Sequence, residues 1–113
     1  MKEKILLITL LVFYYSALSQ ELELIPNLPV YTNFGYQDES VEYNGNIYLR
    51  FRNNNGVFEL VKFDGNQYTT IPNPPNHSNN GRGYWGNPFE YDGELFLQYL
   101  NNDNVFQLYK YDG

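Results

Sequence analysis

Hydrophobic and polar residues alternate with a period of two in several short stretches of the chain. Between residues 46 and 52, for example, Ile47, Leu49 and Phe51 alternate with Arg50 and Arg52. A period of two places alternate side chains on opposite faces of a β-strand. These stretches therefore predict short strands at residues 41–43, 46–52, 57–63 and 67–71, and again at residues 89–91, 94–100 and 105–111.

Turn signals separate the expected strands. Asn44-Gly45 is typical of a two-residue hairpin turn of the primed type, in which both residues adopt a positive φ. Runs of Asn and Gly at residues 53–56, and Asp64-Gly65, indicate further turns. No stretch after residue 19 combines helical periodicity with capping residues. The sequence therefore predicts an all-β, antiparallel fold.

One block of the sequence occurs twice. Residues 42–65 align without a gap with residues 90–113, at an offset of 48, and 12 of the 24 positions are identical. The similarity extends further, because IPNLP at residues 25–29 recurs as IPNPP at residues 71–75. We interpret this as two repeats of about 48 residues, the first about 24–71 and the second about 72–113. Each repeat is expected to be a meander of four short antiparallel strands, and the second lacks the fourth strand.

The third strand of each repeat carries apolar side chains on both faces. In the first repeat Leu60 lies on one face of the strand, and Val61 and Phe63 lie on the opposite face. A strand with one solvated face would alternate apolar and polar residues instead. We therefore expect each sheet to be covered on both sides, and we expect Leu60 and its repeat equivalent Leu108 to be buried alike.

The repeat resembles known β-propeller families. The run from Val57 to Pro75 is similar to the kelch pattern, and the segments 59–65 and 107–113 are similar to bacterial secreted repeats with the signature Glu-Leu-Trp-x-x-Asp-Gly. Here Val61 and Tyr109 stand in place of the signature Trp, and the paired glycines of kelch repeats are absent. The resemblance implies that each repeat forms a propeller-like blade, and that the two blades make an incomplete propeller.

Two blades do not close a ring, because propellers typically have at least four. Three interpretations remain open. The chain is a fragment of a longer gene product, or a short protein of which several copies assemble into one propeller, or an isolated open array. The segment Glu21–Ile25 precedes Pro26 as residues 67–71 precede Pro72. We therefore expect Glu21–Ile25 to be a strand that completes a blade other than its sequence neighbour, and to promote self-association.

The first 19 residues have the layout of a secretory signal peptide. Lys2 and Lys4 precede an apolar run from Ile5 to Tyr15, and Ala17-Leu18-Ser19 fits a signal-peptidase site. The run is shorter than the roughly 20 residues that span a bilayer. We therefore expect cleavage before Gln20, no membrane span afterwards, and a bacterial protein that is secreted, held at the cell surface or periplasmic.

Charge and composition narrow the choice of partners. Removal of residues 1–19 leaves 94 residues and changes the formal charge from −6 to −7, because two lysines and one glutamate are lost. An acidic chain with scattered lysines and arginines argues against binding to nucleic acid. Because the chain contains no cysteine, packing, a metal or assembly with other chains must hold the fold. We expect an unknown protein or a glycan as partner.

The sequence offers little that is typical of catalysis. His77 is the single histidine, and in an Asn-rich loop it is expected to be solvated. Glu42 and Glu90 recur at equivalent positions, which suits a structural hydrogen bond better than an acid–base pair. The Asn-rich turns have too few carboxylates for calcium. We therefore expect neither an enzyme nor a cofactor or metal site.

The expected loop at residues 79–87 differs in character from the rest. It brings Arg82, Tyr84 and Trp85 close together among glycines, and such a set suits stacking on a sugar ring. The alternative is that these aromatic rings pack between the repeats. The sequence therefore predicts a secreted, non-enzymatic interaction scaffold, with carbohydrate binding through Arg82, Tyr84 and Trp85 as the alternative function.

Overall fold

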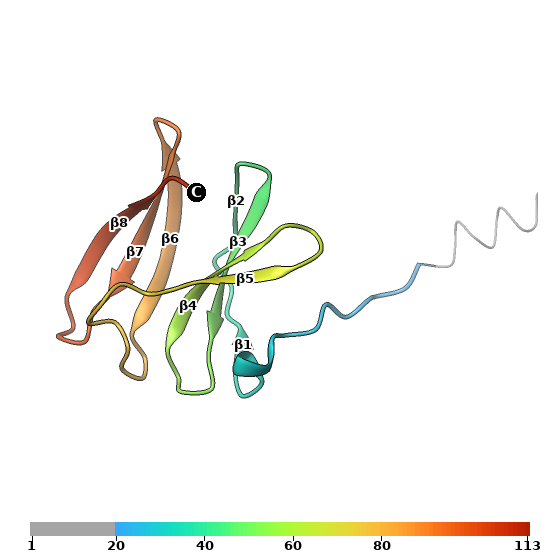
Figure 1. The fold of residues 1–113 in the computed structure, drawn as a ribbon, viewed down its shortest axis with the longest axis horizontal. Helices are drawn as coiled ribbons and strands as arrows, with labels where there is room; N and C mark the ends of the chain where they lie inside the picture. The colour runs from blue at the N-terminus through green and yellow to red at the C-terminus, as the bar shows by residue number, and fades with distance from the viewer. Residues whose placement is uncertain (1–19) are drawn as a thin grey trace, which may run out of the picture.

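A computed structural model describes residues 20–113, and the expected signal peptide lies outside the described residues. These residues form an all-β fold with one short 3-10 turn, η1. Figure 1 shows the strands gathered in two groups that stand side by side. The elements are η1 (Pro29–Tyr31), then β1 (Gly35–Tyr36), β2 (Val41–Tyr43), β3 (Asn46–Arg52), β4 (Phe58–Phe63) and β5 (Tyr68–Ile71), which make the first group, and β6 (Gly83–Tyr91), β7 (Glu94–Leu100) and β8 (Phe106–Tyr111), which make the second.

The first group is antiparallel throughout. Strand β3 pairs with β4, and β4 pairs with β5. Strands β1 and β2 share the other edge of β3. The β2–β3 hairpin has the expected primed turn, with φ of 49° at Asn44 and 79° at Gly45. One parallel bridge, between Phe58 and Gly83, joins this group to the second and makes the whole an open mixed sheet.

The second group repeats the first at the expected offset. Strands β7 and β8 begin and end 48 residues after β3 and β4. A single long strand, β6, takes the places of β1 and β2 along the edge of β7. The strands expected at residues 41–43, 46–52 and 94–100 are confirmed. Those expected at 57–63, 67–71 and 105–111 begin one residue later than expected, and β6 begins earlier than the expected 89–91.

One local expectation is wrong, and another is not tested by the single chain. Most of the expected loop at residues 79–87 belongs to β6, which begins at Gly83. Register shifts on either side of Gly86 let this strand keep its pairing with β7 despite its glycines and proline. The segment Glu21–Ile25 forms no strand within residues 20–113, where no β-partner lies beside it, so its pairing with another blade stays a prediction.

An asparagine organises the turn after the second strand of each repeat. The Asn53 side-chain oxygen accepts hydrogen bonds from the backbone N–H groups of Asn55 and Val57, at 2.9 and 3.0 Å. In the second repeat Asn101 accepts the equivalent bonds from Asp103 and Val105. The side chain thereby replaces backbone partners that the turn lacks, which explains why Asn stands at both positions.

Each group of strands has two faces, which we call the front face and the back face. Equivalent residues of the two repeats lie on faces of the same name. The front face carries the side chains at Tyr48 and Leu60 in the first group, and at Phe96 and Leu108 in the second. The back face carries Leu49 and Phe51 in the first group. Its counterparts in the second group are Leu97 and Tyr99.

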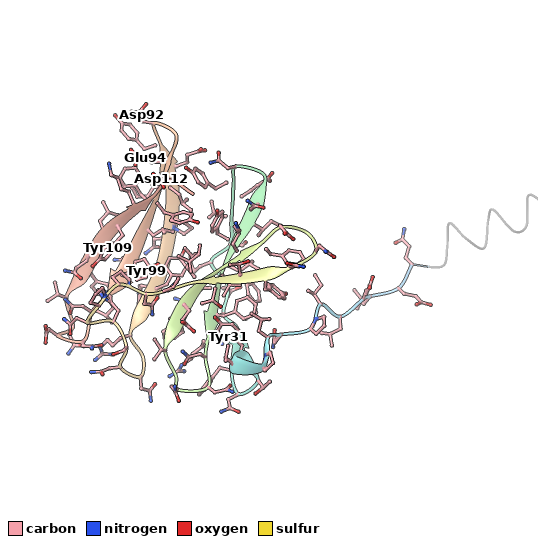
Figure 2. The ribbon with its side chains drawn as sticks, in the orientation of Figure 1. Tyr31, Asp92, Glu94, Tyr99, Tyr109 and Asp112 are labelled. Atoms are coloured by element: carbon pink, nitrogen blue, oxygen red, sulfur yellow. The ribbon has the colours of Figure 1, made fainter. Side chains whose placement is uncertain are left out.

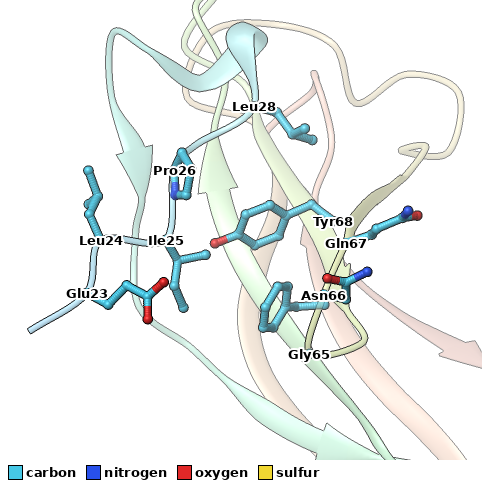
Figure 3. Close-up of a pocket in the computed structure, with 10 residues that line it drawn as sticks. Glu23, Leu24, Ile25, Pro26, Leu28, Gly65, Asn66, Gln67 and Tyr68 are labelled. Carbon is cyan, nitrogen blue, oxygen red and sulfur yellow. The ribbon is translucent and has the colours of Figure 1, made fainter.

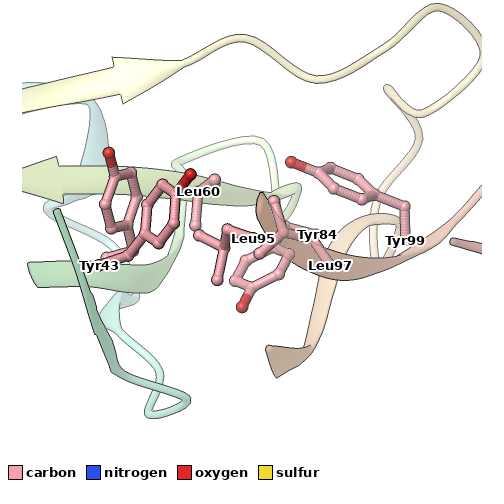
Figure 4. Packing of buried hydrophobic residues seen from close by; sticks show 7 residues of the cluster. Tyr43, Leu60, Tyr84, Leu95, Leu97 and Tyr99 are labelled. Carbon is pink, nitrogen blue, oxygen red and sulfur yellow. The ribbon is translucent and has the colours of Figure 1, made fainter. Parts of the chain in front are cut away.

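The main core lies where the front face of the first group meets the back face of the second, as Figure 4 shows. Leu60 is at its centre and has no exposed surface. Tyr43 and Tyr48 of this core meet edge to face, with ring centroids 6.0 Å apart, and Tyr84 is tilted against Tyr99 at 5.4 Å. The buried members are Tyr43, Tyr48 and Leu60 from the first group, and Tyr84, Leu95, Leu97 and Tyr99 from the second.

The expectation that Leu60 and Leu108 are buried alike is wrong. Leu60 is 0% exposed, whereas Leu108 is 62% exposed. The two residues occupy equivalent positions on β4 and β8. Their environments differ because the second group covers the front face of the first, whereas the front face of the second is open to solvent around Leu108.

Truncation of the two leucines should therefore have unequal effects. We expect Leu60→Ala to lower the free energy of unfolding by about 2–5 kcal/mol, because it leaves a cavity in the core. Leu108→Ala, on an exposed face, should change it by no more than about 0.5 kcal/mol. Urea unfolding of both variants measures the difference, and equal losses would contradict the described packing.

The buried tyrosines should make the fold sensitive to alkali. Burial raises the pKa of Tyr31 and of Tyr48 from 10.0 to about 12, and it also raises the pKa of Tyr84 and Tyr99. As the pH rises, these tyrosine hydroxyls lose their protons in the unfolded chain before they do so in the folded chain. The contribution of the neutral tyrosines to the free energy of unfolding is therefore fully present below pH 10 and declines as the pH rises toward 12. Unfolding measured across this range should show the decline, and Tyr48→Phe should lessen it. An equally steep decline in that variant would show that Tyr48 does not contribute.

Candidate interaction surface

Large apolar side chains cover the front face of the second group and are open to solvent. Phe89 and Phe106 are 49% and 52% exposed. Phe89 stacks on the half-buried Phe96, with ring centroids 5.1 Å apart and planes 5° from parallel. Contiguous exposed apolar surface of this kind marks interaction sites on soluble proteins.

A shallow hollow of about 330 Å³ lies on this face, between Phe89, Phe106 and Leu108. Polar groups border it at one side, where the Asn87 amide donates a hydrogen bond to Gln98 Oε1 at 2.6 Å. An apolar floor with a polar rim is the usual anatomy of a protein–protein contact.

The repeat-equivalent side chains of the first group are buried or partly buried. Tyr48, the counterpart of Phe96, lies in the core with Leu60. Val41, the counterpart of Phe89, packs against the same core. The two front faces therefore have the same apolar character, and they differ in whether another group covers them.

The back face of the first group is the second open surface. Only part of this face is open: Tyr36 and Ile47 are exposed on it, whereas Phe51 and Val61 are buried with Tyr31 of η1 in a second, smaller core cluster. The ring centroids of Tyr31 and Phe51 lie 5.0 Å apart. The N-terminal segment passes beside this face. Figure 3 shows Leu24, Ile25 and Tyr68 around a hollow of about 660 Å³, between this segment and the β4–β5 turn.

Hydrogen bonds to backbone carbonyl groups fix how the two groups meet. The Phe58 N–H donates to the Arg82 carbonyl at 2.8 Å, and the Asn73 side-chain amide donates to the Phe58 carbonyl at 2.9 Å. Gly83 has φ of 109°, and a Cβ added to it would lie 2.0 Å from the Phe58 oxygen. Only glycine allows this approach. Arg50 strengthens the contact by donating to the Trp85 carbonyl.

The structure places Arg82, Tyr84 and Trp85 on or next to the same strand but in different environments. Tyr84 is 0% exposed and belongs to the core. Trp85 is half-buried and packs edge to face on Phe58 and Phe106, with centroids 5.9 and 5.5 Å away. Arg82 is half-buried, and its Nη1 donates to the Gly81 carbonyl. A ligand role for these three residues stays a prediction. Tyr84 has no accessible surface at which a ligand could contact it.

His77 is a buried packing residue, so the expectation of a solvated loop histidine is wrong. Its ring lies edge to face against Tyr99 and Tyr109, with both centroids 5.7 Å away, and Figure 2 labels these two tyrosines at the second group. Its Nδ1 donates to the Pro75 carbonyl at 2.7 Å. At an offset of 46, Tyr31 takes the same place against Phe51 in the first repeat.

The carboxylates do not form a site. Glu42 and Glu90 are exposed, and neither side chain makes a hydrogen bond to the rest of residues 20–113, contrary to the expected structural bond. Asp92, Glu94 and Asp112 lie near one end of the second group in Figure 2. Within the described part of the chain, no group of histidines and carboxylates is arranged to hold a metal ion.

No protein-family model, curated protein or solved structure matches the chain. Within residues 20–113, no helix has the length and apolar character needed to cross a membrane.

Proposed function

We propose that the chain is a secreted, non-enzymatic repeat module of the β-propeller type that acts as an interaction scaffold. The observation that carries the proposal is the unequal burial of equivalent residues. Leu60 is fully buried by a neighbouring repeat, whereas Leu108 is 62% exposed on a face of the same apolar character. The exposed face is therefore suited to receive a further blade.

The contact between the two groups supports this proposal. It joins a front face to a back face, so each blade of such a module can cover the next in the same way. The kelch-like resemblance, the expected signal peptide and the absence of a recognisable catalytic set favour a bacterial protein that works outside the cytoplasm through binding. Four-stranded blades fit the pairing order β2-β3-β4-β5 of the first group.

A chain lengthened by one repeat tests the proposal. A second copy of residues 66–113 is fused after Gly113, which reproduces the junction between Gly65 and Asn66. The added back face should bury Leu108, Phe89 and Phe106. Because burial of each such side chain contributes about 1.5–3 kcal/mol, we expect the free energy of unfolding to rise by several kcal/mol.

The matched control is the same fusion with Leu108→Glu in the middle repeat, which places a charge in the new contact. Its unfolding should return toward that of the two-repeat chain. An added repeat that exchanges its amide hydrogens freely and adds no stability would overturn the proposal.

Carbohydrate binding remains the alternative function, and Trp85 and Arg82 are the residues that solvent still reaches. If the alternative holds, a glycan array should show binding that Trp85→Ala reduces at least about tenfold, because the variant loses the stacking ring. Tyr36→Ala, at the position that repeats Tyr84 on the first group, is the matched control. No binding, or equal binding by Trp85→Ala, removes the alternative.

A further inference from the structure

We propose that the front face of the second group receives the back face of the first group of another copy of this chain, so that copies associate head to tail. The inference rests on the proposed function and names the partner. Within one chain, a front face and a back face already fit together around Leu60. The surfaces left open at the two ends are one front face and the part of one back face around Tyr36 and Ile47.

The internal contact also gives the register of the proposed one. Phe58 and Gly83 form its bridge, and a shift by one repeat converts this pair into Phe106 of one copy and Gly35 of the next. Gly35 is prepared for that role, because its φ is 79° and its pairing with Arg52 repeats that of Gly83 with Leu100.

Asn27 occupies the place that the bridge requires. Asn73, its repeat counterpart, donates to the Phe58 carbonyl. The Nδ2 atom of Asn73 lies 2.6 Å from a Cβ added to Gly83, and that of Asn27 lies 2.7 Å from a Cβ added to Gly35. Asn27 of the second copy is therefore oriented to donate to the Phe106 carbonyl of the first copy.

The N-terminal segment supplies the strand that the second repeat lacks. In the first group β5 pairs with β4, with Ile71 opposite Leu60 and Thr69 opposite Lys62. Among the described residues β8 pairs with β7 alone, so its outer edge is open. The same register places residues 22–25 of the second copy along this edge.

Side chains match across that pairing. Ile25 of the second copy would lie opposite Leu108, and Glu23 opposite Lys110, so one pair is apolar and the other has opposite charges. Leu24 is 86% exposed, so the segment is available for pairing. Ile25 already lines a hollow with Tyr36 on the back face of the first group, as Ile71 packs against the core between the groups.

The proposed contact uses two different surfaces, so it does not stop at a symmetric pair. Head-to-tail contacts of this kind generate a closed ring if the rotation closes, and an open filament if it does not. The native chain should therefore form species larger than a dimer as its concentration rises.

Cysteine pairs test the register in a chain that contains no native cysteine. The chain from Gln20 is suitable, because every described strand and both core clusters lie within it. We expect Glu23→Cys with Lys110→Cys to give disulfide-linked multimers on mild oxidation. The matched control is Glu23→Cys with Asp103→Cys, which lies seven residues away and roughly 20 Å along the chain from the paired position.

Light scattering over a concentration series gives the second readout. We expect Leu108→Glu to prevent association while its melting matches that of the native chain at low concentration, because Leu108 is exposed in the single chain. A native chain that is monomeric at its highest soluble concentration overturns the inference, and so do multimers that persist in Leu108→Glu or cross-link equally in the control pair.

The two proposals can fail separately. If the three-repeat fusion gains stability but the native chain stays monomeric, blade stacking holds and the second copy is excluded as the partner. If the fusion gains nothing, the proposed module function itself fails, whatever the association state of the native chain.

Discussion

The structure depends on the contact between the front face of the first strand group and the back face of the second. The first group has only a small core of its own, around Phe51 and Val61, and a sheet of three or four short strands needs another layer to bury its remaining apolar face. Leu60 and Tyr84, both fully buried, lie on the two sides of that contact. Without the contact, both groups would present a row of aromatic rings to water.

A glycine sets how closely the groups approach. At Gly83 the backbone of β6 comes within hydrogen-bonding range of β4, and a side chain there would meet the Phe58 carbonyl. Around this point Asn73 and Arg50 bond to backbone carbonyls on either side of the contact, which fixes the angle as well as the distance. Apolar packing supplies the stabilising free energy, and these few polar bonds select one arrangement of the groups.

Much of the fold could be predicted from the sequence because its signals are local. The alternation in residues 46–52 and the Asn44-Gly45 turn each need only neighbouring residues, and both appear where expected. The beginning of β6 was missed, because glycines at residues 83 and 86 favour a loop unless a partner strand supplies the pairing. The burial of His77 was also not predictable from neighbouring residues, because the rings that cover it, Tyr99 and Tyr109, lie far from it in the sequence.

The candidate surface was only half predictable. Apolar residues on both faces of residues 57–63 indicate that each sheet is covered on both sides, but they do not say which face lacks a cover in a chain of two repeats.

The spacing of 48 residues between equivalent strands has a consequence for how such a chain can change length. Because every repeat presents the same two faces, tandem duplication of a repeat adds one more contact of a kind that already exists. A gene of this type can therefore gain or lose whole units without evolving a new interface.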